Sequence, residues 1–174
     1  MERGENMHEF NNISIRGRMA YLLCSFKKLL IYYNCTIDDW KIILEKLWKF
    51  TSVEYLDDWM YEIAEYLPDS IMEDSIEDVE YITEEEFVFC KQLYSYIADD
   101  IKEMLQIIFE LGTCEIYGKI TNNSINTLEK LKEGVLLLKK NNITLIDIEP
   151  FKKYEFCDEN GWGSPFNGKE LFDL

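Results

Sequence analysis

The amino-acid sequence predicts a mainly α-helical protein: a bundle of about five helices with a short extended or β C-terminal appendage. Apolar residues recur at steps of three and four over most of the first 142 positions, which is the spacing of one helix face. Polar residues at capping positions precede several of these runs. From residue 143 the pattern changes to short alternating and Gly-rich segments. We therefore expect a single domain over 1–174, with a helical core at about 12–142 and an aromatic, Gly-rich tail at about 143–174.

The first two helices are predicted from clear apolar stripes. The first stripe comprises Ile15, Met19, Leu22, Leu23, Phe26, Leu29, Leu30 and Tyr33, with Ser14 or Asn12 as the candidate cap. Thr36 is expected to cap the second helix, because its hydroxyl can accept a bond from an early backbone N–H and two acids follow it. The second stripe comprises Trp40, Ile43, Leu44, Leu47 and Trp48.

A third helix is predicted from the capping-box spacing of Thr51 and Glu54 to Leu67, where Pro68 prevents continuation. Its inward positions are Leu56, Met60, Ile63 and Leu67, and its polar face holds Asp57, Asp58, Glu62 and Glu65. Residues 68–82 are rich in Ser, Asp and Glu, and we expect them to form an exposed acidic loop. A helical turn around Ile71, Ile76 and Val79 has weak support in this segment.

Thr83 and Glu86 form another capping-box pattern, which opens the strongest periodic run. Its apolar positions are Phe87, Cys90, Tyr94, Ile97, Ile101, Met104, Ile108 and Leu111. We expect one long helix here, bent near Asp99 and Asp100, with Gly112 as a candidate terminator. Whether residues 113–120 are helix, strand or loop stays open.

The fifth helix and the tail complete the chain. The helix is predicted from about 123 to 142, with Ile125, Leu128, Leu131, Val135 and Leu138 on its apolar face. Residues 143–148 alternate enough for a short strand or an extended segment, and 152–156 are a second candidate. Residues 160–168 have turn chemistry, and we expect Trp162 and Phe166 to pack this tail onto the helices.

The charge of the chain is concentrated in one segment. Of a formal net charge of −16, residues 51–90 supply fourteen acidic side chains and no Lys, Arg or His. Such a field attracts cationic partners and repels nucleic acid and anionic membrane surfaces. The pattern favours a basic protein as the partner, although generic solubility explains it equally well.

Residue patterns of common catalytic and metal centres are missing from the sequence. The single histidine, His8, stands in a polar terminus, which argues against Ser-His-Asp or Cys-His chemistry. No zinc-ligand spacing, calcium loop or phosphate-binding glycine motif occurs. Asp58 and Glu62 are four apart on one helical face, and solvated surface is the favoured interpretation over a metal site. We therefore expect no catalytic residue, no cofactor and no metal.

The cysteines and the hydropathy indicate a compartment. Five cysteines show no C-x-x-C pair and no disulfide-framework spacing, which favours reduced thiols in a cytoplasm. The first ten residues lack an apolar signal region, and Lys27 and Lys28 interrupt the most apolar stretch. Secretion and membrane spanning are not expected.

Two segments carry a resemblance to known proteins. The tail Asn160–Lys169 (NGWGSPFNGK) and the upstream Leu111–Gly118 (LGTCEIYG) resemble a family of small bacterial immunity proteins. Such proteins are encoded beside polymorphic toxins and neutralise them. The resemblance implies that function for most of the chain, but it transfers no toxin-contact residue, no toxin activity and no catalytic residue.

Our first hypothesis is therefore an immunity protein that occludes a cognate, basic toxin domain with its acidic surface. The predicted contact residues are Asp57, Asp58, Glu62, Glu65, Glu73, Asp74, Glu77 and Asp78, with Trp59 as an aromatic anchor. One alternative is a carboxylate-based metal-binding protein or enzyme of unknown class. Another is an acidic adaptor or DNA mimic, which the irregular spacing of the acids does not favour. The oligomeric state stays open.

Overall fold

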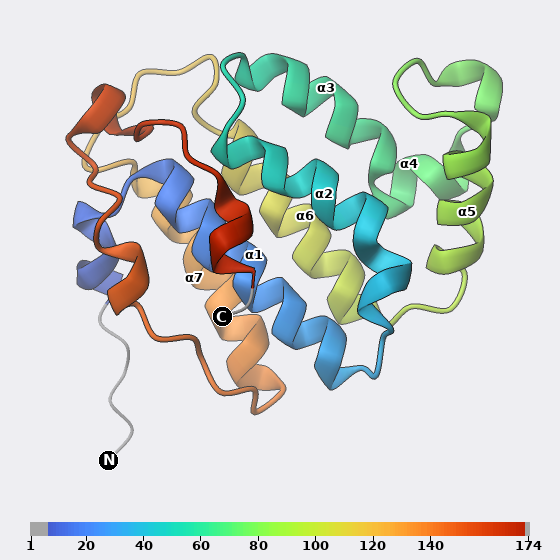
Figure 1. Ribbon diagram of the computed structural model, residues 1–174, viewed down its shortest axis with the longest axis horizontal. Helices are drawn as coiled ribbons and strands as arrows, with labels where there is room; N and C mark the ends of the chain where they lie inside the picture. The colour runs from blue at the N-terminus through green and yellow to red at the C-terminus, as the bar shows by residue number, and fades with distance from the viewer. Residues whose placement is uncertain (1–6, 173–174) are drawn as a thin grey trace.

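The computed structural model describes residues 7–172, which are mainly helical (Figure 1). The α-helices are α1 (Ile15–Tyr32), α2 (Lys41–Trp48), α3 (Leu56–Tyr66), α4 (Pro68–Glu73), α5 (Glu84–Tyr94), α6 (Asp99–Thr113) and α7 (Ile125–Lys140). Short 3-10 helices are η1 (Met7–Asn12), η2 (Ile37–Trp40), η3 (Lys49–Thr51), η4 (Ile76–Asp78), η5 (Glu149–Phe151), η6 (Asp158–Gly161) and η7 (Gly168–Leu171). The predicted helical class is confirmed, with more and shorter helices than the five expected.

Helix α1 lies at the centre of the molecule. Ser14 caps it as predicted, because its Oγ accepts a hydrogen bond of 3.1 Å from the backbone N–H of Gly17. Nearly every side of α1 is buried, and it packs against α2, α6 and α7. A surface helix buries only one stripe, so this all-round burial identifies α1 as the core element.

Two of the expected helix starts are wrong. Thr36 makes no side-chain capping bond, and the chain there forms the 3-10 turn η2 before α2 begins. Thr51 does not open a capping box, because its hydroxyl donates to the carbonyl oxygen of Trp48 at 2.9 Å and it closes η3 instead. Helix α3 therefore starts at Leu56 rather than at Thr51. In both places a local 3-10 turn precedes the helix, and at Thr51 the hydroxyl bonds back into that turn.

The predicted acidic loop at 68–82 is partly helical. Pro68 stands in the first turn of α4, where its missing N–H costs nothing and its fixed φ favours a helix. A capping box between Ser75 and Asp78 then opens η4. The expectation of a continuous loop was wrong because Pro68 begins a new helix as well as ending α3.

The long helix expected from Thr83 to Leu111 is two helices. The capping box of Thr83 and Glu86 opens α5 as predicted. The helix stops at Tyr94, and extended backbone at Ala98 separates it from α6. Asp99 and Asp100 occupy the first turn of α6, where negative side chains favour the helix start. These acids therefore mark a helix start, where the sequence suggested a bend.

Gly112 lies inside α6 and permits close packing against α3. A Cβ atom at this position would lie 2.6 Å from Cζ3 of Trp59. The absence of a side chain thus lets the indole of α3 rest on the α6 backbone. Gly112 does not terminate the helix, which continues to Thr113.

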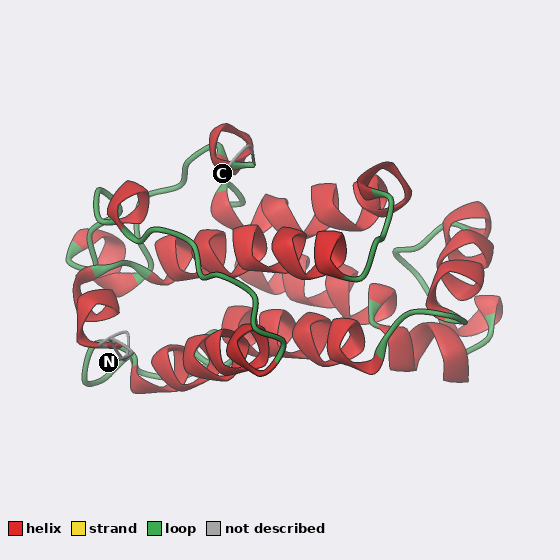
Figure 2. Cartoon of the chain, turned by 90° about the horizontal axis from the view of Figure 1, so that it is seen from below, coloured by secondary structure: helices red, strands yellow, loops and turns green. Residues whose placement is uncertain are grey.

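The tail after α7 forms no strand in its described part, residues 143–172, and Figure 2 shows it as loops and short helices. Its one isolated bridge there pairs Glu155 with Ile13. Trp162 and Phe166 pack against the core as expected, with Phe166 stacked on Tyr154 at 3.9 Å between ring centroids. The last two residues of the predicted tail lie outside the described residues.

Different parts of the chain form the two ends of the molecule. Helices α4 and α5 pack against each other at one end of the long axis, whereas η1 and part of the tail occupy the other (Figure 1). No helix among the described residues is both long and apolar enough to cross a membrane. Residues 51–90 include α3, α4 and most of α5, so the acidic segment runs along α3 and around the α4–α5 end.

Candidate functional site

The predicted contact residues belong to neighbouring elements. Five of them are on α3, Glu73 ends α4, and Asp74, Glu77 and Asp78 lie in and around η4. Because α3 packs on α4, and α4 on α5, these residues share one region of the molecule. Their individual environments differ, and they divide into buried, internally bonded and free side chains.

Trp59 is buried and cannot act as the predicted anchor. Its side chain is 1% exposed and packs against Phe50, with ring centroids 4.9 Å apart. Its indole N–H donates to the backbone oxygen of Lys46 at 3.1 Å. Trp59 therefore joins α3 to the core, and it presents no surface to a partner.

Glu62 is paired within the chain. Its carboxylate lies 2.7 Å from Nζ of Lys46 and 3.1 Å from Nζ of Lys49. Burial alone raises the pKa of Glu62, but the hydrogen bonds from the two lysines outweigh it and hold the pKa below its ordinary value. Its charge is compensated locally, so Glu62 contributes little to an attractive field.

Two other predicted acids bond to the backbone around η4. The carboxylate of Glu65 accepts hydrogen bonds from three consecutive backbone N–H groups, those of Glu80, Tyr81 and Ile82. Asp78 accepts bonds from the backbone N–H and the hydroxyl of Ser75, which hold its pKa below the ordinary value. These two acids therefore hold the backbone around η4 in place, and their carboxylates are already bonded within the chain.

The remaining acids of the segment are largely free. Four predicted residues, Asp58, Glu73, Asp74 and Glu77, are exposed and accept no side-chain hydrogen bond or ion pair from the described residues. The same holds for Glu54, Asp69, Glu80, Glu84 and Glu85. Asp57 accepts a bond from its neighbour's backbone N–H at 3.2 Å and is partly exposed. A negative field on this face comes mainly from these side chains.

Three exposed tyrosines lie among the free acids. Tyr61, Tyr81 and Tyr117 are 48%, 45% and 74% exposed. The hydroxyls of Tyr61 and Tyr117 are 3.4 Å apart.

Tyr117 and Tyr81 also have carboxylates near them. The hydrogen bond to Tyr61, with a smaller effect from Asp57, raises the pKa of Tyr117. Desolvation, followed by the charges of Glu80 and Asp58, raises the pKa of Tyr81. We call Tyr61, Tyr81, Tyr117, Asp57 and Asp58 the tyrosine–carboxylate surface.

Sequence reasoning found part of this surface. Tyr61 follows Asp57 by four residues and Asp58 by three, so helical spacing places each acid beside it on α3. Tyr117 is far away in sequence, in the segment that follows α6, and no local pattern connects it to α3. Aromatic rings ringed by polar groups are typical of binding hot spots, and here exposed tyrosines take the place predicted for Trp59.

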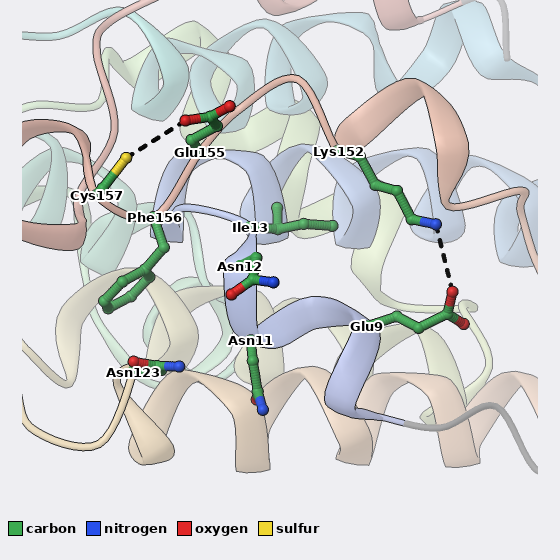
Figure 3. A pocket seen from close by; sticks show the side chains of 9 residues that line it. All are labelled: Glu9, Asn11, Asn12, Ile13, Asn123, Lys152, Glu155, Phe156 and Cys157. Carbon is green, nitrogen blue, oxygen red and sulfur yellow. Dashed lines mark hydrogen bonds and ion pairs between the residues drawn. The ribbon is translucent and has the colours of Figure 1, made fainter.

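A polar cleft of about 720 Å³ lies near the other end of the molecule, between η1 and the tail (Figure 3). Its charged side chains pair across it: Nζ of Lys152 lies 3.3 Å from Oε1 of Glu9. The thiol of Cys157 donates to Glu155 at 3.4 Å. The other lining side chains are Asn11, Asn12, Ile13, Asn123 and Phe156. Because its charged groups already have partners, this cleft is a weaker candidate than the tyrosine–carboxylate surface.

Within residues 7–172, no group of three or more His, Cys, Asp or Glu side chains is arranged to hold a metal ion. Comparison with known proteins gives no match: no family model, no curated protein and no solved structure is significantly similar to this chain.

Proposed function

We propose that this chain is an immunity protein, which binds and occludes a cognate basic toxin domain in the cytoplasm of the producing bacterial cell. The observation that carries the proposal is the tyrosine–carboxylate surface, where exposed aromatic rings lie among unpaired acids. The resemblance of the tail NGWGSPFNGK to immunity proteins supports the same function.

The surface has both properties that such binding needs. Unpaired carboxylates steer a cationic partner during encounter and are screened by salt. Tyrosine supplies a large, rigid contact area together with a hydroxyl group that can bond to the partner. Rings that are exposed in the free protein would become desolvated anchors at the centre of the interface.

The free acids around η4 extend the surface toward α5. Glu73, Asp74 and Glu77 carry no internal bond to a described side chain, so their charges are available to Lys or Arg of the toxin. Mutual repulsion among these acids raises the energy of the free protein, and a basic partner relieves that repulsion. Inhibition would follow from covering the toxin's own substrate site.

A charge-reversal experiment tests the proposal. Asp58, Glu73, Asp74 and Glu77 are replaced together by Lys, and binding to the protein encoded by the neighbouring gene is measured by co-purification and calorimetry. We expect a loss of affinity of about a hundredfold or more at low salt, and a weaker salt dependence.

The matched control places the same charge change elsewhere. Asp38, Glu45, Glu103 and Glu129 are exposed outside the acidic segment and become Lys in the control variant. We expect this variant to keep most of the affinity. Equal affinity of the first variant and the unchanged protein would exclude the acidic surface, and no binding by the unchanged protein would exclude this partner.

A further inference from the structure

One carboxylate organises the segment that carries Tyr81. Glu65 Oε1 accepts from the backbone N–H of Glu80 at 2.7 Å, and Oε2 accepts from those of Tyr81 and Ile82 at 2.6 and 2.9 Å. Among the described residues, no other acceptor is bonded to these three N–H groups. The segment between η4 and α5 thus takes its backbone bonds from a side chain of α3.

These bonds matter because the segment has little else to hold it. It lies outside any helix, and Glu80 and Tyr81 are exposed. Ile82 is 5% exposed and anchors only the end next to α5. Hydrogen bonds to a charged carboxylate are about twice as strong as neutral ones, so three of them onto one group fix the backbone locally.

The position of Glu65 explains why Tyr81 lies in the neighbourhood of Tyr61, whose charge acts on it. Glu65 follows Tyr61 by four residues on α3, so the two side chains share one helix face. Holding residues 80–82 against Glu65 therefore holds Tyr81 near Tyr61. The carboxylate is occupied by the three N–H groups, so its contribution to the surface is indirect.

We infer that Glu65 is a positioning residue: its carboxylate clamps residues 80–82 and thereby presets Tyr81 in the tyrosine–carboxylate surface. The role in partner binding rests on the proposed function, whereas the clamp itself does not. A surface fixed before encounter avoids the entropy cost of ordering during binding. The clamp therefore acts on how long the complex lasts, separately from the charge that steers association.

The first arm of the test needs no partner. Glu65→Gln removes the charge and one acceptor oxygen while it keeps the side-chain size. Amide hydrogen exchange of residues 80, 81 and 82, followed by NMR, should become about tenfold faster or more. Exchange in α1 and α6 should stay unchanged, which shows that the fold is retained. Glu65→Asp keeps the charge on a shorter stem and should give an intermediate rate.

The second arm measures binding of the protein encoded by the neighbouring gene. The control Glu45→Gln removes the same charge from an exposed position on α2 that bonds to no described residue. Each variant loses a single negative charge, so their association rates should differ little from each other. Only Glu65→Gln should dissociate faster, by about fivefold.

The two arms separate the possible failures. Unchanged exchange at residues 80–82 overturns the clamp. Faster exchange with equal dissociation of Glu65→Gln and Glu45→Gln overturns the role in the surface. If the unchanged protein does not bind this partner, the proposed function is wrong for this partner. The hydrogen-exchange measurement still decides whether Glu65 positions Tyr81.

Discussion

Charges in the centre of this molecule and charges at its acidic end are used in opposite ways. On α1, two buried arginines bond almost entirely to neutral oxygens. Arg16 donates to the backbone oxygens of Gly163, Phe50 and Val53, and Arg18 donates to those of Phe10, Asn11 and Ser124 and to the Thr127 hydroxyl. Burial lowers the pKa of Arg18 to about 10, and the nearby charge of Glu115 opposes that shift.

At the acidic end, by contrast, most charged side chains have no partner of opposite charge. Of the fourteen acids between residues 51 and 90, only Glu62 forms an ion pair with a described residue. A buried charge is costly unless every donor is bonded, whereas an exposed one can remain unpaired in water. The buried cations therefore bond the elements of the fold together, whereas most of the exposed acids keep their charges unpaired.

The largest expected effect is on the buried side of this comparison. Arg18→Ala leaves several buried oxygens without their donor and opens a cavity, so it should lower the free energy of unfolding by about 3 kcal/mol or more. Urea denaturation followed by circular dichroism measures this loss. The control Lys132→Ala removes an exposed cation and should change stability by about 0.5 kcal/mol or less. Equal stability of the two variants would show that the Arg18 bonds do not hold the fold.

A smaller effect is expected at Glu62, which has a paired charge within the acidic segment. Its pKa is lowered in the folded protein, so its contribution is present above the unfolded value of about 4.3 and is lost as the pH falls through the folded value. Glu62→Gln should cost about 1 kcal/mol at pH 7, because the group is partly solvated. Denaturation across pH 7 to 3 should show the difference between the two proteins shrinking, and a constant difference would contradict the pairing.

The smallest effect on stability is expected for the free acids. Replacing Glu73, Asp74 and Glu77 by Gln, Asn and Gln removes repulsion and breaks no bond to a described side chain. Stability should stay within about 0.5 kcal/mol or rise slightly at low salt. Thermal unfolding at low and high salt measures this change. A marked loss of stability would mean that these acids serve the fold, as Glu65 does.

Helical periodicity was sufficient to place most of the fold. The apolar stripes located α1, α2, α6 and α7, because burial of one face dominates helix formation in a protein. Local capping patterns were less reliable: the box at Thr83 was correct, and the one at Thr51 was wrong because its hydroxyl bonds back to Trp48. The break at residues 95–98 contains neither Gly nor Pro, so no helix-breaking residue marks it.

The sequence predicted the negative charge of the candidate site but not the roles of its individual residues. Composition alone located the acidic segment, and helical spacing placed Asp57 and Asp58 on the polar face of the third helix. The internal roles of Glu62 and Glu65 depend on lysines of the α2–η3 stretch and on backbone N–H groups beyond η4. Trp59 and Tyr61 are two residues apart on one amphipathic helix, and only the packing of α3 onto α6 shows which of them faces solvent.

The most direct test of the central claim is the affinity of Tyr61→Ala for the protein encoded by the neighbouring gene. The control is Tyr96→Ala, at a tyrosine that is 77% exposed outside the tyrosine–carboxylate surface. We predict a loss of at least about tenfold for Tyr61→Ala, which is the size of a binding hot spot, and no loss for Tyr96→Ala. Equal affinity of both variants and the unchanged protein would contradict the claim that this surface binds the partner.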